Sequence, residues 1–258
     1  MLDIQMSMST GNSRISIPFL IPIHLMLAQP APASLRAQAY ESFQQQIVDA
    51  NIRPGQFVSQ RALMQLLGIP LGAVRELIPR LEAEGLLKTV PQRGLQVAHV
   101  DLKLINNAFQ LRKLLEREAA GRFVSTVSDS DLAAIEQAHL NIVRRARKTT
   151  IDHDLLQNAT TVDWGLHDMM IDALGNELIA EVNRINSLRV RLIKLEGSTL
   201  SADVLIPAME EHLWFIDALK RRDAPAVVDR LGHHIESAHR RVLGLPRPAL
   251  PWSLENPG

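Results

Sequence analysis

The spacing of apolar residues divides the chain into a short mixed segment and a longer helical one. Residues 34–51 favour a helix with Leu35, Ala39, Phe43, Ile47 and Val48 along one side. A second helix is predicted to begin at Ser59, whose hydroxyl can cap free amides, and to end at Gly68. The segment therefore opens with two helices, of which the second is short.

The next stretch predicts a third helix and a hairpin. After Pro70 four apolar residues recur at the spacing of one buried stripe: Val74, Leu77, Ile78 and Leu81. This helix is predicted to end at Gly85. Two β-prone runs, 86–90 and 95–98, are then joined by the turn residues 91–94. Helix, tight turn, helix and β-wing predict a winged helix-turn-helix domain over residues 34–98.

Beyond Val97 long amphipathic helices follow one another, so the fold is predicted to be mostly α. Six helices are predicted: 102–125, 129–146, 152–174, 177–195, 202–222 and 224–243. They imply an all-helical bundle over residues 99–245, followed by a Pro-rich tail at 246–258.

Composition limits the kind of partner only weakly. The formal net charge is zero, and residues 34–98 hold seven Lys or Arg against five Asp or Glu. Any contact with nucleic acid must therefore come from the placement of charges. The absence of cysteine excludes disulfides and thiolate metal sites, and fits a reducing compartment such as the cytoplasm.

Specific motifs connect both segments to a known family. In the first they are Pro54-Gly55, Val74-Arg75-Glu76, Arg80-Leu81-Glu82, Glu84-Gly85-Leu86 and Pro91 to Gly94. In their order and spacing these motifs resemble the DNA-binding domain of the GntR superfamily of bacterial transcription regulators. The second segment, with Arg112, Leu115 and Glu116 in "QLRKLLEREAAGRF" and the later runs "DWGLHDMMIDALGN" and "LGHHI", resembles the FCD ligand-binding domain of the FadR branch. The resemblance implies a homodimeric, cytoplasmic regulator, expected to be a repressor and not an enzyme.

Four side chains are candidate metal ligands. Asp163 and His167 lie four residues apart on one predicted helix and so project from the same face, while His212 and His234 lie on the last two helices. One carboxylate and three imidazoles suit Zn(II), Ni(II) or Mn(II). The resemblance implies the same four ligands, with the adjacent His233 as the alternative for the last position.

Metal-holding FCD pockets commonly admit a small organic acid, so the resemblance also implies an effector site. Arg112 and Arg189 are the candidates to bind its carboxylate, because a guanidinium presents a planar fork to such a group. The alternative for each is an arginine in solvent or in a surface salt bridge.

For the DNA contacts, family position implies Arg61, Arg75, Gln92, Arg93 and Gly94. Arg75 is expected to read a base, unless it pairs with a neighbouring glutamate on the helix surface.

The recognition helix departs from the family pattern at its start. Where the family often has Ser-Arg-Thr-Pro, this chain has Pro70-Leu71-Gly72-Ala73, so a base-reading arginine and two hydroxyl groups are absent. Pro79 is expected to bend the same helix. Either the operator differs from the family's usual one, or affinity for DNA is low.

Other interpretations remain open at this stage. Residues 1–33 are expected to be a disordered extension, or the start codon is placed too early, since Met26 would also serve. The apolar run 15–28 after Arg14 also has features of a signal peptide. The ligand set alone would also suit a metal-dependent hydrolase. A third alternative is a ligand-sensing module whose DNA-binding domain is degenerate.

Overall fold

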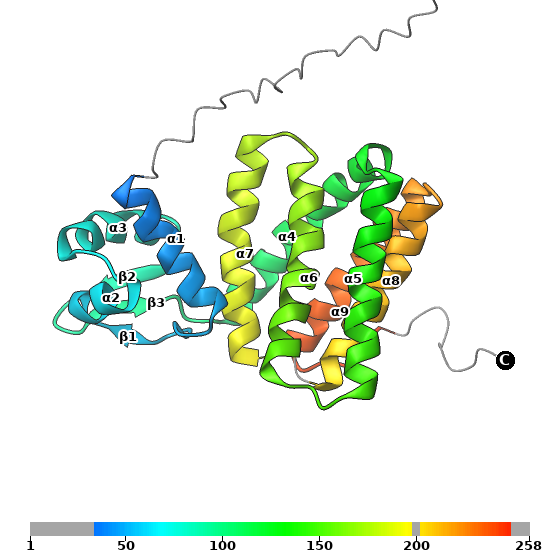
Figure 1. Ribbon diagram of the computed structural model, residues 1–258. Coiled ribbons are helices and arrows are strands. Elements are labelled where there is room, and N and C mark those ends of the chain that lie inside the picture. Colours follow the sequence, from blue (N-terminus) through cyan, green and yellow to red (C-terminus); the bar gives the residue numbers. More distant parts are fainter. Residues whose placement is uncertain (1–33, 198–201, 249–258) are drawn as a thin grey trace, which may run out of the picture. The chain divides into compact units, whose positions relative to one another are not determined.

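A computed structural model describes residues 34–197 and 202–248, and these form nine helices and three short strands (Figure 1). The extension predicted at 1–33 lies outside the described residues, as does most of the predicted tail at 246–258. The description therefore covers both predicted domains.

The winged helix-turn-helix predicted from the sequence is confirmed. Its elements are α1 (Leu35–Val48), β1 (Phe57–Val58), α2 (Gln60–Leu67), α3 (Leu71–Ala83), β2 (Leu87–Val90) and β3 (Gly94–Val97). Helices α2 and α3 are bent by 103° from one another, as in a helix-turn-helix. Both predicted ends of α2 are present, because the Ser59 hydroxyl accepts from the amide of Ala62 and Gly68 takes a left-handed conformation.

The small sheet contains one strand that the sequence did not predict. Its order is β1-β3-β2, all antiparallel, and β1 is only two residues long, too short to show an alternating pattern. The backbone of β1 passes close to Gly94, where φ is +91° and an added Cβ would lie 3.2 Å from the Val58 carbonyl oxygen. A glycine is thus required at the end of the wing turn.

The buried side of α1 differs from the prediction at both ends. Leu35 and Val48, the first and last residues of the helix, are 49% and 40% exposed, and Tyr40 lies in the core instead. The remaining predicted residues, Ala39 and Phe43 among them, are buried. The ends of α1 extend past the core that its middle covers.

The second domain is a helical bundle, as predicted. Its helices are α4 (Leu102–Thr126), α5 (Asp129–Lys148), α6 (His153–Asp172), α7 (Glu177–Gly197), α8 (Ala202–Lys220) and α9 (Ala224–Val242). Aspartate or serine side chains cap the starts of four of them: Asp101, Ser128, Asp152 and Asp223. Helix α4 packs on α9 and α5 packs on α8, so the middle of the bundle lies among α4, α5, α6, α8 and α9.

Helix α7 contributes to two cores. Val190 and Ile193 pack in the bundle, whereas Leu188 and Leu192 belong to the apolar core of the winged domain. Along the described ranges, no single helix is long and apolar enough to span a membrane. Only α2 and α3 taken together, as a bent pair, have the length and apolar composition of such a span.

Candidate metal centre

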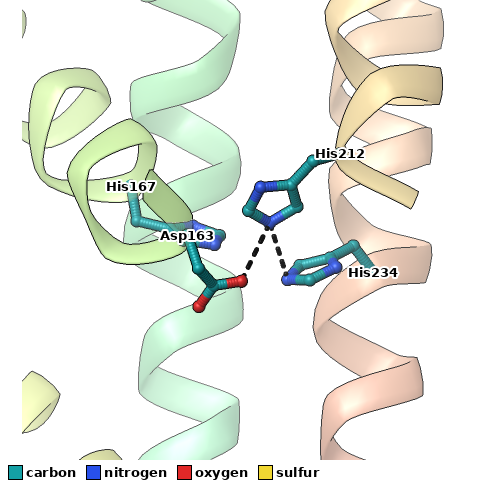
Figure 2. Close-up of side chains that lie close together, drawn as sticks. All are labelled: Asp163, His167, His212 and His234. Atoms are coloured by element: carbon teal, nitrogen blue, oxygen red, sulfur yellow. Dashed lines mark hydrogen bonds and ion pairs between the residues drawn. The ribbon is translucent and has the colours of Figure 1, made fainter. Parts of the chain in front are cut away.

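The four predicted ligand residues come together in the middle of the bundle. Asp163 and His167 project from α6, His212 from α8 and His234 from α9, and each is at most 2% exposed. One possible ligand atom from each residue lies within 4.8 Å of those of the others. Figure 2 shows the three imidazoles and the carboxylate around one point. The two residues at i and i+4 on α6 thus lie next to two histidines that are far away in sequence.

The distances and unsatisfied atoms of this cluster fit a divalent cation. The Nε2 atom of His212 lies 3.2 Å from Nε2 of His234 and 3.5 Å from Oδ1 of Asp163. The other carboxylate oxygen of Asp163 is buried without a hydrogen-bond partner. Buried unsatisfied oxygen is costly, and an oxygen with three imidazole nitrogens is a donor set for Zn(II), Ni(II) or Mn(II).

A second set of polar groups orients the imidazoles. Nδ1 of His234 donates to Oε2 of Glu211 over 2.9 Å. Nδ1 of His167 lies 2.7 Å from Oε2 of Glu116, at an angle outside that of a regular hydrogen bond. Nδ1 of His212 is 2.9 Å from the Nε2 atom of a further histidine, His139. Since each Nδ1 atom has a neighbour of this kind, the three Nε2 atoms are the ones that face a cation, and that of His167 accepts from Arg112 in its place.

Burial and charge put Asp163, His167 and His212 in the protonation states that a cation needs. Burial lowers the pKa of His167 to about 4, and it lowers the pKa of His212 well below its usual value, so both rings are neutral at neutral pH. Burial alone would raise the pKa of Asp163, but Lys194 and His212 bring it well below the usual range. Neutral imidazoles and an ionised carboxylate are the metal-binding forms.

Arg112 lies directly beside the cluster, buried within α4. Its Nε atom donates to Glu116 over 2.8 Å and one terminal nitrogen donates to Nε2 of His167 over 2.9 Å. The other terminal nitrogen is buried without a partner. Burial would raise the pKa of Glu116, yet Arg112 and His167 lower it to about 2, so the Arg112–Glu116 pair is ionised. Arg112 therefore holds an unsatisfied donor at the edge of the candidate site.

Arg189, the other predicted effector residue, has a different environment. Its guanidinium donates over 2.6 Å to the carbonyl oxygen of Glu84, at the end of α3. Two other cations of α7 lie beside the cluster. Lys194 is 3.6 Å from Oδ2 of Asp163, and Arg191 stacks on the ring of Trp164. The position that faces the site is thus Lys194, five residues further along the helix.

The two adjacent histidines of α9, both candidates for the last ligand position, have different environments. His233 is half-buried, with its ring against Trp214, whereas His234 is 2% exposed and lies in the cluster. The structure thus groups the residue predicted first, His234, with the other three ligands.

The predicted DNA-contact residues are distributed over α2, α3 and the wing. The side chains of Arg61, Arg75, Gln92 and Arg93 are exposed, and Gly94 is half-buried against β1. Within the part of the chain that the structure describes, Arg75 has no ion-pair partner. Neither Glu76 nor Glu82 pairs with it there, and Glu82 accepts from the Thr89 amide. Arg93 stacks on the ring of Phe57, which fixes the side chain on the wing.

Several residues around the site were not singled out by sequence reasoning. They are His139, Lys194 and Glu211, together with the role of Glu116. A signal for His139 existed, because it continues the apolar stripe of Leu132, Ile135 and Ile142 on α5, where an imidazole is out of place. No comparable signal marked Lys194 or Glu211, since charged residues adjoin apolar ones in every helix of the bundle.

Comparison with known proteins agrees with both domains. Residues 35–97 match the family described as bacterial regulatory proteins, gntR family, and residues 107–237 match the FCD domain. The HTH-type transcriptional repressor RspR of Escherichia coli (strain K12) is 23% identical over 221 residues, which cover 84% of this chain and 93% of RspR.

Solved structures share the fold. E. coli McbR/YncC superposes with a TM-score of 0.69 at 18% identity, covering 82% of this chain and 98% of that one. A transcriptional regulator GntR from Rhodococcus sp. RHA1 gives 0.65 at 19% identity, covering 81% and 99%. With both domains matched in this order, the chain belongs to the GntR family of bacterial transcription regulators that carry a C-terminal FCD domain, a family of regulators and not of enzymes.

Proposed function

We propose that the chain is a repressor of the FadR branch that binds an operator as a homodimer and senses a small organic acid through a divalent cation in its FCD domain. The observation that carries the sensing half is the buried convergence of Asp163, His167, His212 and His234. The repressor role is supported by the relative RspR, which is named a repressor.

The cation would be held by one oxygen of Asp163 and the Nε2 atoms of the three histidines. When bound, it supplies a positive centre that accepts a carboxylate oxygen of the acid in its remaining positions. The expected metals are Zn(II), Ni(II) and Mn(II). Elemental analysis of untagged protein, followed by calorimetric titration of the chelator-treated protein, tests this. His212→Ala is expected to bind no metal, and equal binding by that variant would contradict the assignment.

The acid is expected to bind beside the cation on Arg112 and Lys194. One terminal nitrogen of Arg112 has no partner and the other bonds the very nitrogen of His167 that a cation would take. Both would then be free to form a fork with a carboxylate. Lys194 adds a second positive group on the side of Asp163. We assign this second role to Lys194 in place of Arg189, because Arg189 bonds the end of α3.

Helix α7 is the proposed connection between the acid and the DNA. It carries Lys194 beside the cluster and Arg189 against Glu84, the residue that ends the recognition helix α3. A shift of α7 on binding the acid would move both contacts. The acid must bind the two arrangements of α7 with unequal affinity for this shift to change operator binding.

Fluorescence anisotropy with the promoter upstream of the gene tests the DNA-binding half. We expect specific binding that weakens as salt is added, because arginines displace counterions from phosphate. Arg75→Ala is expected to weaken binding by about tenfold or more, the effect of losing one base contact. Arg144→Ala, which removes the same charge from an exposed position of α5, is the matched control and is expected to leave DNA binding unchanged.

Absence of any preference for the promoter over scrambled DNA, even at low salt, would contradict operator binding. It would favour the alternative in which the changed start of α3, Pro70-Leu71-Gly72-Ala73, has removed sequence specificity. In that case Leu71→Arg is the informative variant, since it restores the guanidinium that the family pattern has there.

A further inference from the structure

A fourth buried histidine lies behind the candidate metal centre. His139 projects from α5, a helix that contributes none of the four ligands, and it is 1% exposed. Its Nδ1 atom is 2.7 Å from the carbonyl oxygen of Ile135, and its Nε2 atom is 2.9 Å from Nδ1 of His212. The ring therefore bridges a backbone carbonyl and the back of one ligand.

The carbonyl determines which way the hydrogens point. A carbonyl oxygen only accepts, so Nδ1 of His139 must carry the hydrogen that it donates to Ile135. In a neutral ring the other nitrogen is then a bare acceptor. It can bond His212 only if Nδ1 of His212 is the donor. That arrangement leaves Nε2 of His212 without a hydrogen, facing His234 and Asp163.

We propose that His139 is a positioning residue that holds His212 in the tautomer and orientation in which Nε2 faces the cation. This inference rests on the proposed metal-binding function and adds a residue to it. His139 is not itself a ligand, because both its nitrogens are engaged and its Nε2 atom faces the back of the His212 ring.

The choice of a histidine fits the charge of the site. His167 and His234 are oriented by Glu116 and Glu211, two buried carboxylates. A third carboxylate behind His212 would add another negative charge to a buried cluster that already holds Asp163. A neutral imidazole accepts the same hydrogen bond without adding charge. His139, held by the Ile135 carbonyl, thus does for His212 what a carboxylate does for His167 and His234.

Two substitutions of His139 separate positioning from packing. His139→Phe keeps the ring volume and removes the acceptor, whereas His139→Gln keeps a side-chain carbonyl that can accept from His212. We expect His139→Phe to weaken zinc binding by about 10–100-fold, the usual effect of losing an outer-shell partner, and His139→Gln to stay within about threefold of the wild type. Ile142→Val, on the same buried face of α5, is the control for packing and is expected to leave zinc affinity unchanged.

Zinc titration and nitrogen NMR of the full chain provide the two measurements. In zinc-loaded wild type with ¹⁵N-labelled histidine, we expect His212 to be protonated at Nδ1 and metal-bound at Nε2, with the Nδ1 hydrogen shared with Nε2 of His139. In His139→Phe we expect the Nδ1 signal of His212 to show no hydrogen bond to residue 139.

The outcomes distinguish this inference from the proposed function. Equal zinc affinity in wild type and His139→Phe would overturn the positioning role alone. It would also be overturned if His139→Gln bound zinc as weakly as His139→Phe. A wild type that binds no zinc, nickel or manganese would instead overturn the proposed metal-binding function on which it depends.

Discussion

The centres of the two domains are built from opposite kinds of side chain. The core of the winged domain is apolar, with Phe43, Leu63, Leu77 and Leu95 all at most 1% exposed. The middle of the bundle buries eight polar groups just as deeply: Arg112, Glu116, His139, Asp163, His167, Glu211, His212 and His234. Both sets of side chains are closed to solvent, yet only the apolar set gains free energy simply by leaving water.

This difference separates stability from binding. Burial of an apolar residue needs no ligand to account for it, because each such side chain contributes about 1.5–3 kcal/mol to the free energy of folding. Buried ionisable groups are weak contributors to stability and are often replaceable by apolar ones. Eight of them in one place therefore point to a ligand, whereas the winged core needs no explanation beyond folding.

The largest effect should come from removing a ligand with an apolar side chain. We expect His212→Leu to lower zinc affinity by more than about 1,000-fold, since one of four ligands is gone. The metal-free protein should change in stability by no more than about 2 kcal/mol, because Leu fills the space while His139 loses one partner. Calorimetry and urea unfolding with chelator measure the two quantities. Large destabilisation of the metal-free protein would show that the polar centre is structural after all.

The converse is expected in the winged domain. Leu77→Ala removes a fully buried side chain of α3 and should cost about 2–5 kcal/mol, while zinc affinity stays unchanged. Urea unfolding and zinc titration of the same preparation check this. The matched control is the exposed Leu114→Ala on α4, for which we expect little change in either quantity. A fall in zinc affinity in Leu77→Ala would contradict the separation of the two interiors.

The polar centre should also make the metal-free protein sensitive to acid. The pKa of His167 is about 4 when folded and 6.5 when exposed, so the unfolded chain takes up the proton first as the pH falls. His167 alone should then lower the free energy of unfolding by about 1.4 kcal/mol per pH unit between those values, and His212, whose folded pKa is also lowered by burial, should add to this slope. Below pH 4.5 Glu116, with a folded pKa of about 2, adds a further loss as the unfolded carboxylate is protonated first.

Urea unfolding at a series of pH values measures this slope. His167→Gln removes one titrating ring and should reduce the slope of the upper part of the curve, while the contribution of His212 and the loss below pH 4.5 remain. A wild-type stability that is constant from pH 6.5 to 4 would show that His167 is not buried in its neutral form.

The smallest expected effect has opposite signs for two ligands. Lys194 places a positive charge 3.6 Å from Asp163, so Lys194→Met should strengthen zinc binding several-fold by removing repulsion. The same change should weaken binding of citrate to the zinc-loaded protein by about tenfold, the effect of losing one charge-assisted hydrogen bond. Lys220→Met, in an exposed pair with Glu136, is the control. If both affinities fall together, Lys194 supports the fold and does not bind the acid.

Much of the fold could be predicted because it depends on local patterns. The stripe on α3 and the cap at Ser59 lie within a few residues of the helices that they define. Strand β1 could not be predicted, since its two residues are a strand only through pairing with Gln96 and Leu95. Elements that exist through tertiary contact leave no local pattern.

The candidate site divides along the same line. The pair Asp163 and His167 follows from helical spacing alone, but bringing His212 and His234 to it required the family resemblance. That Arg189 lies away from the cluster has a geometric reason. Helix α7 has two buried sides, and the sequence does not tell which of them faces the cluster. Leu188 lies with Arg189 on the side of the winged domain, and Ile193 lies with Lys194 on the side of the bundle.

The two leucines that α7 contributes to the winged core have a consequence for where that domain ends. By sequence it stops near Ala98, but its apolar interior is completed by Leu188 and Leu192, ninety or more positions later. A fragment that ends at that boundary would expose the apolar surface that Leu188 and Leu192 cover, and we expect it to aggregate. The core of the winged domain is thus completed only after most of the helical domain has been synthesised.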